Sequence, residues 1–302
     1  MKAIVFERFG GPEVLRHTEV EAPAPGPDQI RLRVVAAGVN PLDYKIRNGW
    51  LERVFPTTFP AIPGLEAAGV VDAVGANVTA LAPGDEVFGF TDTGAYAEFA
   101  LATVVARKPA ALSWEEAASL PVAGETAQRV LDLLGVKDGE TVLVHAAAGA
   151  VGGVAVQLAT ARGATVIGTA SPANHDYLRS LGVVPVAYGE GLADRVRAAA
   201  PQGVDAVFDA AGQGALPPSV ELLGGATDRI ITIADAVAAQ ELGIHFSANG
   251  DRTPDGLAEH ARLATAGMLR LEVAQTFPLA DAAHAHSRSA SGHTRGKLLL
   301  RP

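Results

Sequence analysis

The segment from residue 141 to residue 163 constrains the fold of this chain more than any other. It begins with a short apolar run, Thr141 to His145, passes through a turn of alanine and glycine, and continues as an apolar, helix-favouring stretch that ends near Arg162 and Gly163. A strand, a tight glycine turn and a helix in this order form the first unit of a dinucleotide-binding βαβ fold. We therefore expect a parallel sheet with helices on both faces.

The turn carries the pattern Ala147-x-Gly149-x-x-Gly152, with alanine where the commonest fingerprint has its first glycine. N–H groups that are free at a helix start, together with the positive end of the helix dipole, favour a pyrophosphate. Side chains larger than hydrogen would keep the phosphates from the backbone, so we expect the glycines at the points of approach. The predicted contacts are Ala147, Gly149, Ala150, Val151 and Gly152. Packing of an alanine- and glycine-rich helix start is the alternative explanation.

The second predicted strand of this half, Thr165 to Ala170, indicates which nucleotide is bound. A site that prefers NAD usually has an acidic residue about 20 positions after the turn, where it holds the ribose 2′-hydroxyl. Here Ser171 follows the strand, and His175 and Arg179 add positive charge, so no carboxylate repels a 2′-phosphate. We predict NADPH over NADH. Capping of the helix that starts at Pro172 is an alternative role for Ser171, and the two roles are compatible.

Composition narrows the class of protein. The chain has 302 residues, more than one hydrophobic core usually spans, so two domains are expected. A formal net charge of -9 argues against a nucleic-acid partner, and the absence of cysteine excludes disulfides, thiolate metal ligands and a cysteine nucleophile. The first residues have a strand pattern with an early acid, unlike a signal peptide, and no apolar run reaches roughly 18 residues. We expect a cytoplasmic protein without a membrane span.

Residues 1–112 have the pattern of a β-rich, barrel-like domain, because short alternating runs are separated by glycine and proline. Strands are expected at 30–37, 68–75 and 95–100, with a turn that enters a strand at 83–89 and a turn and a short helix within 40–50.

The pattern changes at Ser113, where Ser113-Trp114-Glu115-Glu116 forms a capping box. Helices are expected from Ser113, over about 124–134, from Pro254 and from Ala280. Strands are expected at 141–146, 165–170, 185–188, 204–210, 229–235, 271–274 and 296–300.

Several motifs match one family, in order, along nearly the whole chain. They are Gly38-Val39-Asn40-Pro41-x-Asp43, Pro63-Gly64-x-Glu66-x-x-Gly69, Gly84-Asp85-x-Val87, Gly94-Ala95-Tyr96-Ala97-Glu98, the 145–152 turn and Thr294-Arg295-Gly296-Lys297. With them the chain resembles the zinc-free quinone oxidoreductase branch of the medium-chain dehydrogenase/reductase superfamily, the zeta-crystallin-like group.

The resemblance implies an α/β protein with two domains. A GroES-like β-barrel catalytic domain is expected over residues 1–112 and a doubly wound Rossmann domain that binds NADP over 113–268. A C-terminal segment, 269–302, is expected to return to the first domain. The resemblance also implies an active site in the cleft between the domains and a homodimer.

The residues at the zinc positions of related enzymes differ in this chain. Zinc-dependent relatives place a Cys within the segment 40–43 and a His next to Glu66, at a position that is leucine here. Tetrahedral zinc needs Cys or His at fixed places, so no metal site is expected. His284, His286 and His293 remain, but residues two apart on a helix point to different sides, and we interpret all three as surface histidines.

The resemblance implies a zinc-independent, NADPH-dependent oxidoreductase that transfers hydride to quinones or to the C=C bond of α,β-unsaturated carbonyls. Such substrates carry their own electrophilic carbon and need no Lewis acid. The negative charge that develops on the substrate oxygen must be stabilised and then protonated. Asn40, Tyr44 and Lys45 are the candidate catalytic residues, and a Lys ammonium suits an enolate. Packing of Tyr44 in the barrel and solvation of Lys45 are the alternative explanations.

Two other functions fit the same sequence. One is a pathway-specific enoyl reductase that acts on a single metabolite. The other is a noncatalytic, crystallin-like protein that binds NADPH without turnover. The polar residues at 40–45 favour an enzyme.

Together with the positions of the strand ends, the resemblance implies further nucleotide contacts outside the turn. These are Asn40, Asp43, Thr126, Ser171, His175, Ala211, Ile233, Phe246, Ser247 and Lys297. Relatives often carry a basic residue at the position of Ala173, which this chain lacks. His145 is expected to form structural hydrogen bonds.

An apolar substrate pocket is expected after the short helix. Its predicted lining is Tyr44, Trp50 and Phe55, with Phe59 beside them. A hydrophobic core of the loop after Gly49 is the alternative.

Overall fold

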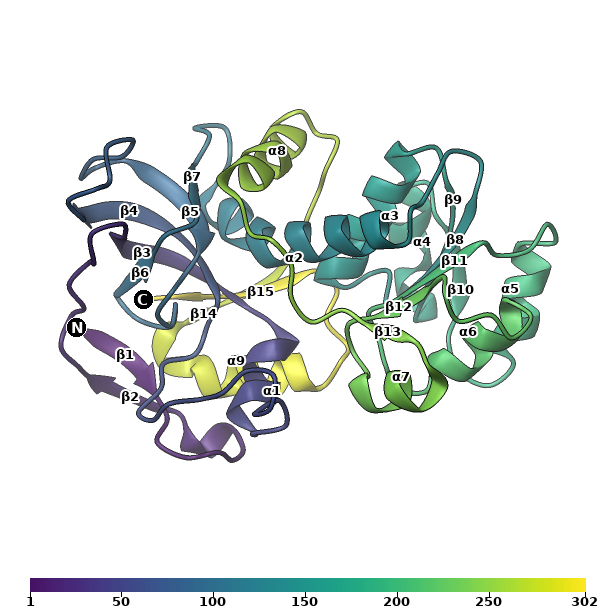
Figure 1. Cartoon of the computed structure of the whole chain (residues 1–302), viewed down its shortest axis with the longest axis horizontal. Helices are drawn as coiled ribbons and strands as arrows, with labels where there is room; N and C mark the ends of the chain where they lie inside the picture. The colour runs from purple at the N-terminus through teal and green to yellow at the C-terminus, as the bar shows by residue number, and fades with distance from the viewer. The chain divides into compact units, whose positions relative to one another are not determined.

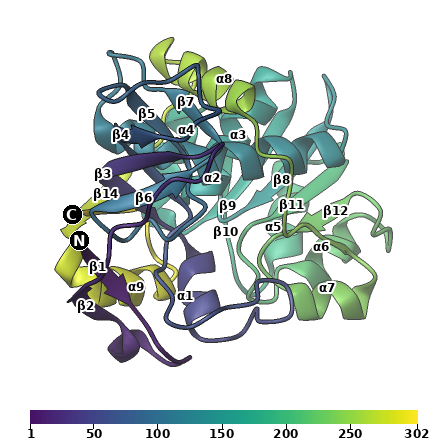
Figure 2. The ribbon, with the colours of Figure 1, turned by 60° about the vertical axis from the view of Figure 1, so that its left-hand side comes forward.

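The computed structural model describes residues 1–302, which divide into two compact units (Figure 1). Unit 1 comprises Met1–Val122 and Arg252–Pro302, and unit 2 comprises Ala123–Asp251. Both chain ends therefore lie in unit 1, where Figure 2 shows them near strand β1. No helix of the structure is both long enough and apolar enough to span a membrane.

Unit 1 is built mainly from strands. Its elements are β1 (Lys2–Val5), β2 (Arg16–Glu19), β3 (Ile30–Val39), α1 (Pro41–Arg47), β4 (Glu66–Val74), β5 (Glu86–Phe90), β6 (Phe99–Ala102), β7 (Val105–Arg107), α8 (Pro254–Thr265), β14 (Val273–Pro278), α9 (Ala282–Ala290) and β15 (Lys297–Arg301).

The sheet of unit 1 joins the two ends of the sequence. Its strand order is β14-β15-β3-β4-β5-β7, and β6 also pairs with β3. Strand β15 runs antiparallel to β3, with Leu298 opposite Val39. The alternating side chains of β3, including Leu32 and Val34, point into the core of this unit. The last strand is thus part of the sheet that carries the start of helix α1.

Unit 2 alternates strands and helices. Its elements are β8 (Thr141–His145), α3 (Ala150–Ala161), β9 (Thr165–Ala170), α4 (His175–Ser180), β10 (Val184–Ala187), α5 (Leu192–Ala199), β11 (Ala206–Asp209), α6 (Leu216–Leu222), β12 (Ile230–Thr232), α7 (Ala236–Leu242) and β13 (His245–Phe246).

The sheet of unit 2 has six parallel strands in the order β10-β9-β8-β11-β12-β13. This is the strand order of a doubly wound dinucleotide-binding fold, with the switch of direction beside β8. All five strands that the sequence predicts here are present, and the predicted α/β fold class is confirmed. The apolar runs predict them well because strands buried on both faces are almost continuously hydrophobic.

One long helix, α2 (Trp114–Leu133), replaces the two helices expected from Ser113 and over 124–134. Its start is as predicted, since Ser113 N–H donates to Glu116 Oε2 at 2.8 Å and Glu116 N–H donates to Ser113 Oγ at 3.2 Å. Pro121 and the glycine at 124 do not end the helix. Leu120 and Ala123 beside them are buried, so tertiary packing outweighs the local preference of these two residues.

The two units also divide at different residues from the expected 112/113 and 268/269. Val122 N–H donates to Glu66 Oε2 at 2.7 Å, which ties the first half of α2 to unit 1. Helix α8 packs against β7, which assigns residues 252–268 to unit 1 as well. The strand expected at 95–100 lies at Phe99–Ala102, because Ala97 instead forms an isolated bridge with Ala3.

Candidate functional site

The turn after β8 presents free N–H groups at the start of α3. Gly149 precedes the helix, and its carbonyl accepts the first helical hydrogen bond, from Gly153 N–H at 2.8 Å. The N–H groups of Ala150, Val151 and Gly152 therefore have no acceptor within the helix. Free N–H groups at the positive end of a helix dipole favour anions.

Gly152 is required by the packing of the turn itself. A Cβ at this position would lie 2.2 Å from the carbonyl oxygen of Ala146, and Ala146 adopts a positive φ of 54°. A Cβ at Gly149 would lie 3.3 Å from the same oxygen, which is a much milder contact. The sequence interpretation assigned both glycines to phosphate approach, but Gly152 first allows the turn to pack on its helix.

The end of β9 places a hydroxyl and an imidazole where an acid would favour NAD. Ser171 lies directly after the strand, and its side chain makes no capping hydrogen bond to the backbone. Its Oγ instead accepts from Asn174 Nδ2 at 3.3 Å. His175 begins α4, with Nε2 3.4 Å from the carbonyl oxygen of Ala170. The Ser171 hydroxyl therefore does not cap the helical turn that begins at Pro172.

A buried carboxylate shapes the loops that follow β11 and β12. Asp209 Oδ1 accepts hydrogen bonds from the N–H groups of Ala211 and Gly212, each at 2.9 Å. Its Oδ2 accepts from Thr232 Oγ1 at 2.7 Å. Ala211 and Ile233 were predicted as nucleotide contacts, and Asp209, which fixes both loops, was missed by the sequence analysis. Its signal is an acid at the end of an otherwise apolar strand.

A second polar cluster of unit 2 links two predicted contacts that are distant in sequence. Thr126 Oγ1 donates to Glu125 Oε2 at 3.2 Å, and Glu125 Oε1 accepts from Arg129 Nε at 2.6 Å. Arg129 also donates to Ser247 Oγ. Phe246 lies half-buried beside it in β13. Glu125 and Arg129 were not predicted, because neither belongs to a recognisable motif.

His145 is structural, as the sequence analysis expected. It is buried, with Nδ1 3.2 Å from Thr169 Oγ1 and Nε2 2.9 Å from Ser219 Oγ. Burial lowers its pKa, with the charge of Asp209 acting in the opposite direction, so the ring is neutral at pH 7.

In unit 1 a buried ion pair lies at the start of α1. Lys297 Nζ donates to Glu66 Oε1 at 2.5 Å and to Asn40 Oδ1 at 2.6 Å. Asn40 Nδ2 donates to the same Glu66 oxygen at 2.7 Å. The exposed fractions are 1% for Lys297, 0% for Glu66 and 5% for Asn40. Lys297, predicted as a nucleotide contact, thus has its ammonium directed at Asn40 and Glu66.

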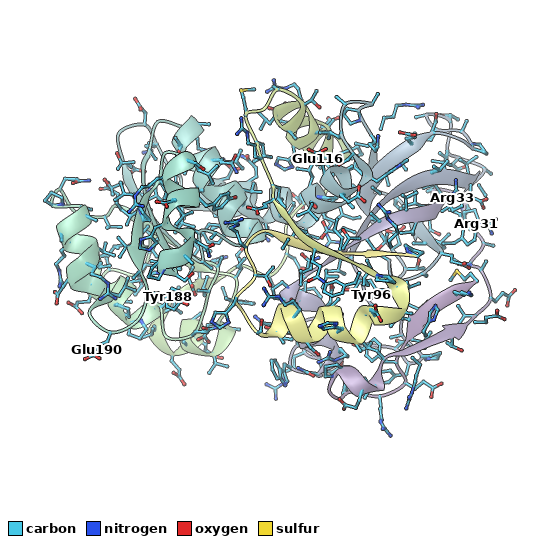
Figure 3. The ribbon with its side chains drawn as sticks, turned by 180° about the vertical axis from the view of Figure 1, so that it is seen from behind. Arg31, Arg33, Tyr96, Glu116, Tyr188 and Glu190 are labelled. Carbon is cyan, nitrogen blue, oxygen red and sulfur yellow. The ribbon has the colours of Figure 1, made fainter.

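A chain of hydrogen bonds crosses the same unit from Arg47 to Asp43. Arg47 Nη1 lies 3.0 Å from His286 Nδ1, His286 Nε2 lies 3.2 Å from the Tyr96 hydroxyl, and Tyr96 donates to Asp43 Oδ2 at 2.8 Å. Figure 3 shows Tyr96 beside helix α9, which carries His286. Because a guanidinium only donates, His286 accepts at Nδ1 and donates from Nε2. Every donor in the chain therefore points toward Asp43.

His286 corrects the expectation of a surface histidine, since it is completely buried. Helix α9 turns a face with two small residues, Ala282 and Ala285, into the core of unit 1, and His286 shares that face. The other two histidines, His284 and His293, are exposed as expected. The spacing of two residues correctly separated His284 from His286 but did not show which of them points inward.

Burial sets the protonation states in this chain. It raises the pKa of Asp43 to about 7, although the hydrogen bonds from Asn40 N–H and Tyr96 and the charge of Lys297 act to lower it. It lowers the pKa of His286 to about 3, with the charge of Arg47 adding to the effect. The second oxygen of Asp43, Oδ1, is buried without a hydrogen-bond partner. Asp43 therefore titrates near neutral pH while His286 remains neutral.

The predicted substrate residues after α1 are only partly brought together. The rings of Tyr44 and Trp50 meet edge to face with centroids 6.2 Å apart, and Trp50 is 68% exposed. Phe59 packs instead on Phe6 and Phe9, with centroids 5.6 and 5.0 Å away. Phe55 is half-buried. An exposed Trp50 does not fit a closed hydrophobic core, and Phe59, which contacts two other phenylalanine rings, is also 37% exposed.

Lys45 is half-buried on α1, next to Tyr44. Burial raises the pKa of Tyr44, so its phenol is protonated at neutral pH. No group of three or more His, Asp or Glu side chains is arranged to hold a metal ion.

Comparison with known proteins identifies the family. Residues 26–110 match the alcohol dehydrogenase GroES-like domain, and residues 181–300 match the family described as zinc-binding dehydrogenase. The chain is 34% identical to 2-haloacrylate reductase from a Burkholderia species, over 99% of this chain and 98% of that protein. It is 38% identical to part of the pikromycin polyketide synthase component PikAII from Streptomyces venezuelae, over 93% of this chain but 8% of that protein.

The structure also resembles that of Escherichia coli quinone oxidoreductase complexed with NADPH. The TM-score is 0.89 with 29% sequence identity, and the match covers 100% of both chains. Several other curated relatives are matched over only 52% to 56% of their own length.

A GroES-like unit combined with a six-stranded parallel sheet and a glycine turn after its first strand defines a two-domain, nucleotide-dependent oxidoreductase. The chain belongs to the medium-chain dehydrogenase/reductase superfamily, in its quinone oxidoreductase branch. The family that the sequence motifs indicated is thus confirmed.

Replacing Gly152 with alanine tests the packing of the turn. We expect Gly152→Ala to lower the free energy of unfolding by about 1–3 kcal/mol, because the new Cβ would meet a backbone oxygen. Gly153→Ala is the matched control on the same helix, since its nearest contact would be an ordinary 3.6 Å. It should be neutral or stabilising by about 0.5–1 kcal/mol. Equal stability of the two variants in chemical denaturation would contradict this account.

The raised pKa of Asp43 predicts a pH-dependent stability. Between its unfolded value, near 4, and its folded value of about 7, the folded state binds the extra proton. Stability gained from this group is therefore complete at low pH and is lost as the pH rises through 7. Relative to Asp43→Asn, the wild type should lose at most about 1.4 kcal/mol per pH unit over this window.

Denaturation curves of both proteins from pH 4.5 to pH 8 measure this difference. The opposite contribution of His286, which is lost as the pH falls toward 3, is present in both proteins. Asp176→Asn, at a side chain that is 98% exposed, is the control and should leave the slope unchanged. A wild type whose stability runs parallel to that of Asp43→Asn would contradict the shifted pKa.

Proposed function

We propose that this chain is a zinc-independent, NADPH-dependent reductase of quinones or of the C=C bond of α,β-unsaturated carbonyls. The observation that carries the proposal is the start of α3, with three free N–H groups, in a chain similar over its whole length to a quinone oxidoreductase structure that holds NADPH. The chain lacks cysteine, as the zinc-free branch does at its metal positions.

The residues of unit 2 fit NADPH. The N–H groups of Ala150, Val151 and Gly152 suit the pyrophosphate, and the hydroxyl of Ser171 and the imidazole of His175 suit a 2′-phosphate. Residues 171–175 contain no acid that would repel it. When bound, this cofactor supplies the hydride.

The residues of α1 suit the substrate end of the reaction. A reduced enone or quinone develops negative charge on oxygen, which a cation or a hydrogen-bond donor stabilises. In the proposed assignment the ammonium of Lys45 stabilises this charge, and the protonated phenol of Tyr44 donates a hydrogen bond. The exposed ring of Trp50, in contact with Tyr44, supplies an apolar surface for a flat substrate.

A pathway-specific enoyl reductase is the second candidate. It is favoured by the 38% identity to part of a polyketide synthase component. It uses the same cofactor residues and the same charge stabilisation, and it differs in accepting one enoyl substrate. A noncatalytic NADPH-binding protein is less well supported, because residues 40–45 keep polar side chains suited to catalysis and Tyr44 contacts an exposed aromatic ring.

The proposal includes a homodimer and a cytoplasmic location. Light scattering distinguishes the dimer from a monomer of 30.9 kDa. A nucleic-acid partner is not part of the proposal, in keeping with the net charge of -9.

Cofactor choice is tested at Ser171. The wild type should have a lower KM for NADPH than for NADH. Ser171→Asp should raise the KM for NADPH by about 10-fold or more through charge repulsion, with little change for NADH. Ser180→Asp, at the C-terminal end of helix α4, is the control and should keep the preference. Equal use of both nucleotides by the wild type would disprove the assignment.

Substrate activation is tested at Lys45. On a panel of quinones, alkenals and cyclic enones, Lys45→Ala should lower kcat/KM by roughly 100-fold, the usual cost of losing one donor to a developing oxyanion. Lys137→Ala, at an exposed lysine, should have no effect. An unchanged kcat/KM in Lys45→Ala removes this residue from the mechanism. Tight NADPH binding without turnover of any substrate supports the noncatalytic alternative.

A further inference from the structure

The side-chain amide of Asn40 can adopt only one orientation. Lys297 Nζ lies 2.6 Å from Asn40 Oδ1, and Asn40 Nδ2 lies 2.7 Å from Glu66 Oε1. An ammonium only donates hydrogen bonds, and a carboxylate only accepts them. In the reversed amide, N–H groups would face the ammonium and oxygen would face the carboxylate. The ion pair therefore fixes Asn40 Oδ1 toward Lys297 and Asn40 Nδ2 toward Glu66.

The groups that hold the amide are themselves fixed. Glu66 is completely buried, and its other oxygen accepts from Val122 N–H at 2.7 Å. Rotation of the carboxylate would break that bond. Lys297 belongs to β15, which pairs with β3 directly before Asn40. Because Lys297 and Glu66 are buried from water, no solvent molecule can replace either partner without a large desolvation cost.

One hydrogen of the amide is left for a ligand. Asn40 Nδ2 carries two hydrogens, and Glu66 Oε1 accepts one of them. We propose that Lys297 and Glu66 are positioning residues, which hold the second Asn40 N–H as a donor to the substrate oxygen on which negative charge develops. This inference rests on the reductase activity proposed above. It also gives Lys297 a role other than the nucleotide contact expected from the sequence.

The orientation of the Asn40 amide matters because its reversal would turn an attraction to the substrate oxyanion into a repulsion. With Nδ2 outward, the amide stabilises a developing oxyanion through a fixed donor. With Oδ1 in that place, the outward-facing carbonyl lone pair lies against the same oxyanion and repels it. In this proposal the ion pair does not contact the substrate. It affects the reaction only by fixing the orientation of the Asn40 side-chain amide.

A neutral double variant, Lys297→Met/Glu66→Gln, tests this role. Replacement of a buried ion pair by uncharged side chains of similar size is often near neutral for stability. The amide that replaces the Glu66 carboxylate must present its oxygen to Val122 N–H, so its nitrogen faces Asn40 and favours the reversed orientation. We expect kcat on quinones and enones to fall by roughly 100-fold. The dissociation constant of NADPH should stay within a factor of about two, because no nucleotide contact is removed.

Lys108→Met/Glu86→Gln is the matched control. It removes another Lys–Glu pair of unit 1, with Nζ and Oε2 3.0 Å apart, and should keep the wild-type kcat. A folded Lys297→Met/Glu66→Gln protein with wild-type kcat overturns the inference. Loss of NADPH affinity with unchanged kcat also overturns it, since it would assign Lys297 and Glu66 to cofactor binding.

The amide can also be observed without turnover. In ¹⁵N-labelled protein, the Asn40 side-chain NH₂ signals are assigned by their loss in Asn40→Asp. Addition of NADP⁺ and a quinone to the wild type should shift one of the two proton signals, and an unshifted pair overturns the inference even if the double variant does not fold. A wild type that reduces no quinone or enone overturns the proposed function instead, so the two failures are distinguishable.

Discussion

The buried ion pair between Lys297 and Glu66 is the interaction on which unit 1 depends. Removing two charges from water costs several kcal/mol for each ion, and the pair is tolerated only because its remaining donors and acceptors find partners. Asn40 and the N–H of Val122 supply those partners. The pair therefore joins β4, β15, the start of α1 and the first half of α2 into one arrangement, and neither ion can be left alone without a large loss of stability.

Three buried carboxylates each accept hydrogen bonds from backbone N–H groups. Glu66 holds the N–H of Val122, Asp43 holds the N–H of Asn40, and Asp209 holds the N–H groups of the loop after β11. In each case an acid, removed from water, orders backbone that carries candidate site residues. Charged or polar side chains are thus used here to fix the geometry of loops and helix starts, where apolar packing alone gives little directional control.

The features that were predicted correctly from the sequence are those set by residues close to one another in the chain. The strands of unit 2 and the turn after β8 followed from apolar runs and glycine spacing, because strands buried on both faces must be hydrophobic. His286 could not be placed in the same way. Its partners, Arg47 and Tyr96, lie 239 and 190 residues away, and no periodicity reports such contacts. Helix α2 likewise continues through Pro121, because the residues on either side of the proline are buried by tertiary packing. A rule that considers only the proline predicts that the helix ends or kinks there.

The division of unit 1 into two stretches of sequence affects how it is made. Glu66 and Asp43 are synthesised early, yet Lys297 follows Glu66 by 231 positions, and the whole of unit 2 comes between them. On a ribosome, the βαβ unit can therefore close while the barrel still lacks its last strand and the cation for its buried acid. Unit 1 can therefore be completed only after all of unit 2 has been translated, so its folding must wait for the last segment of the chain, Arg252–Pro302.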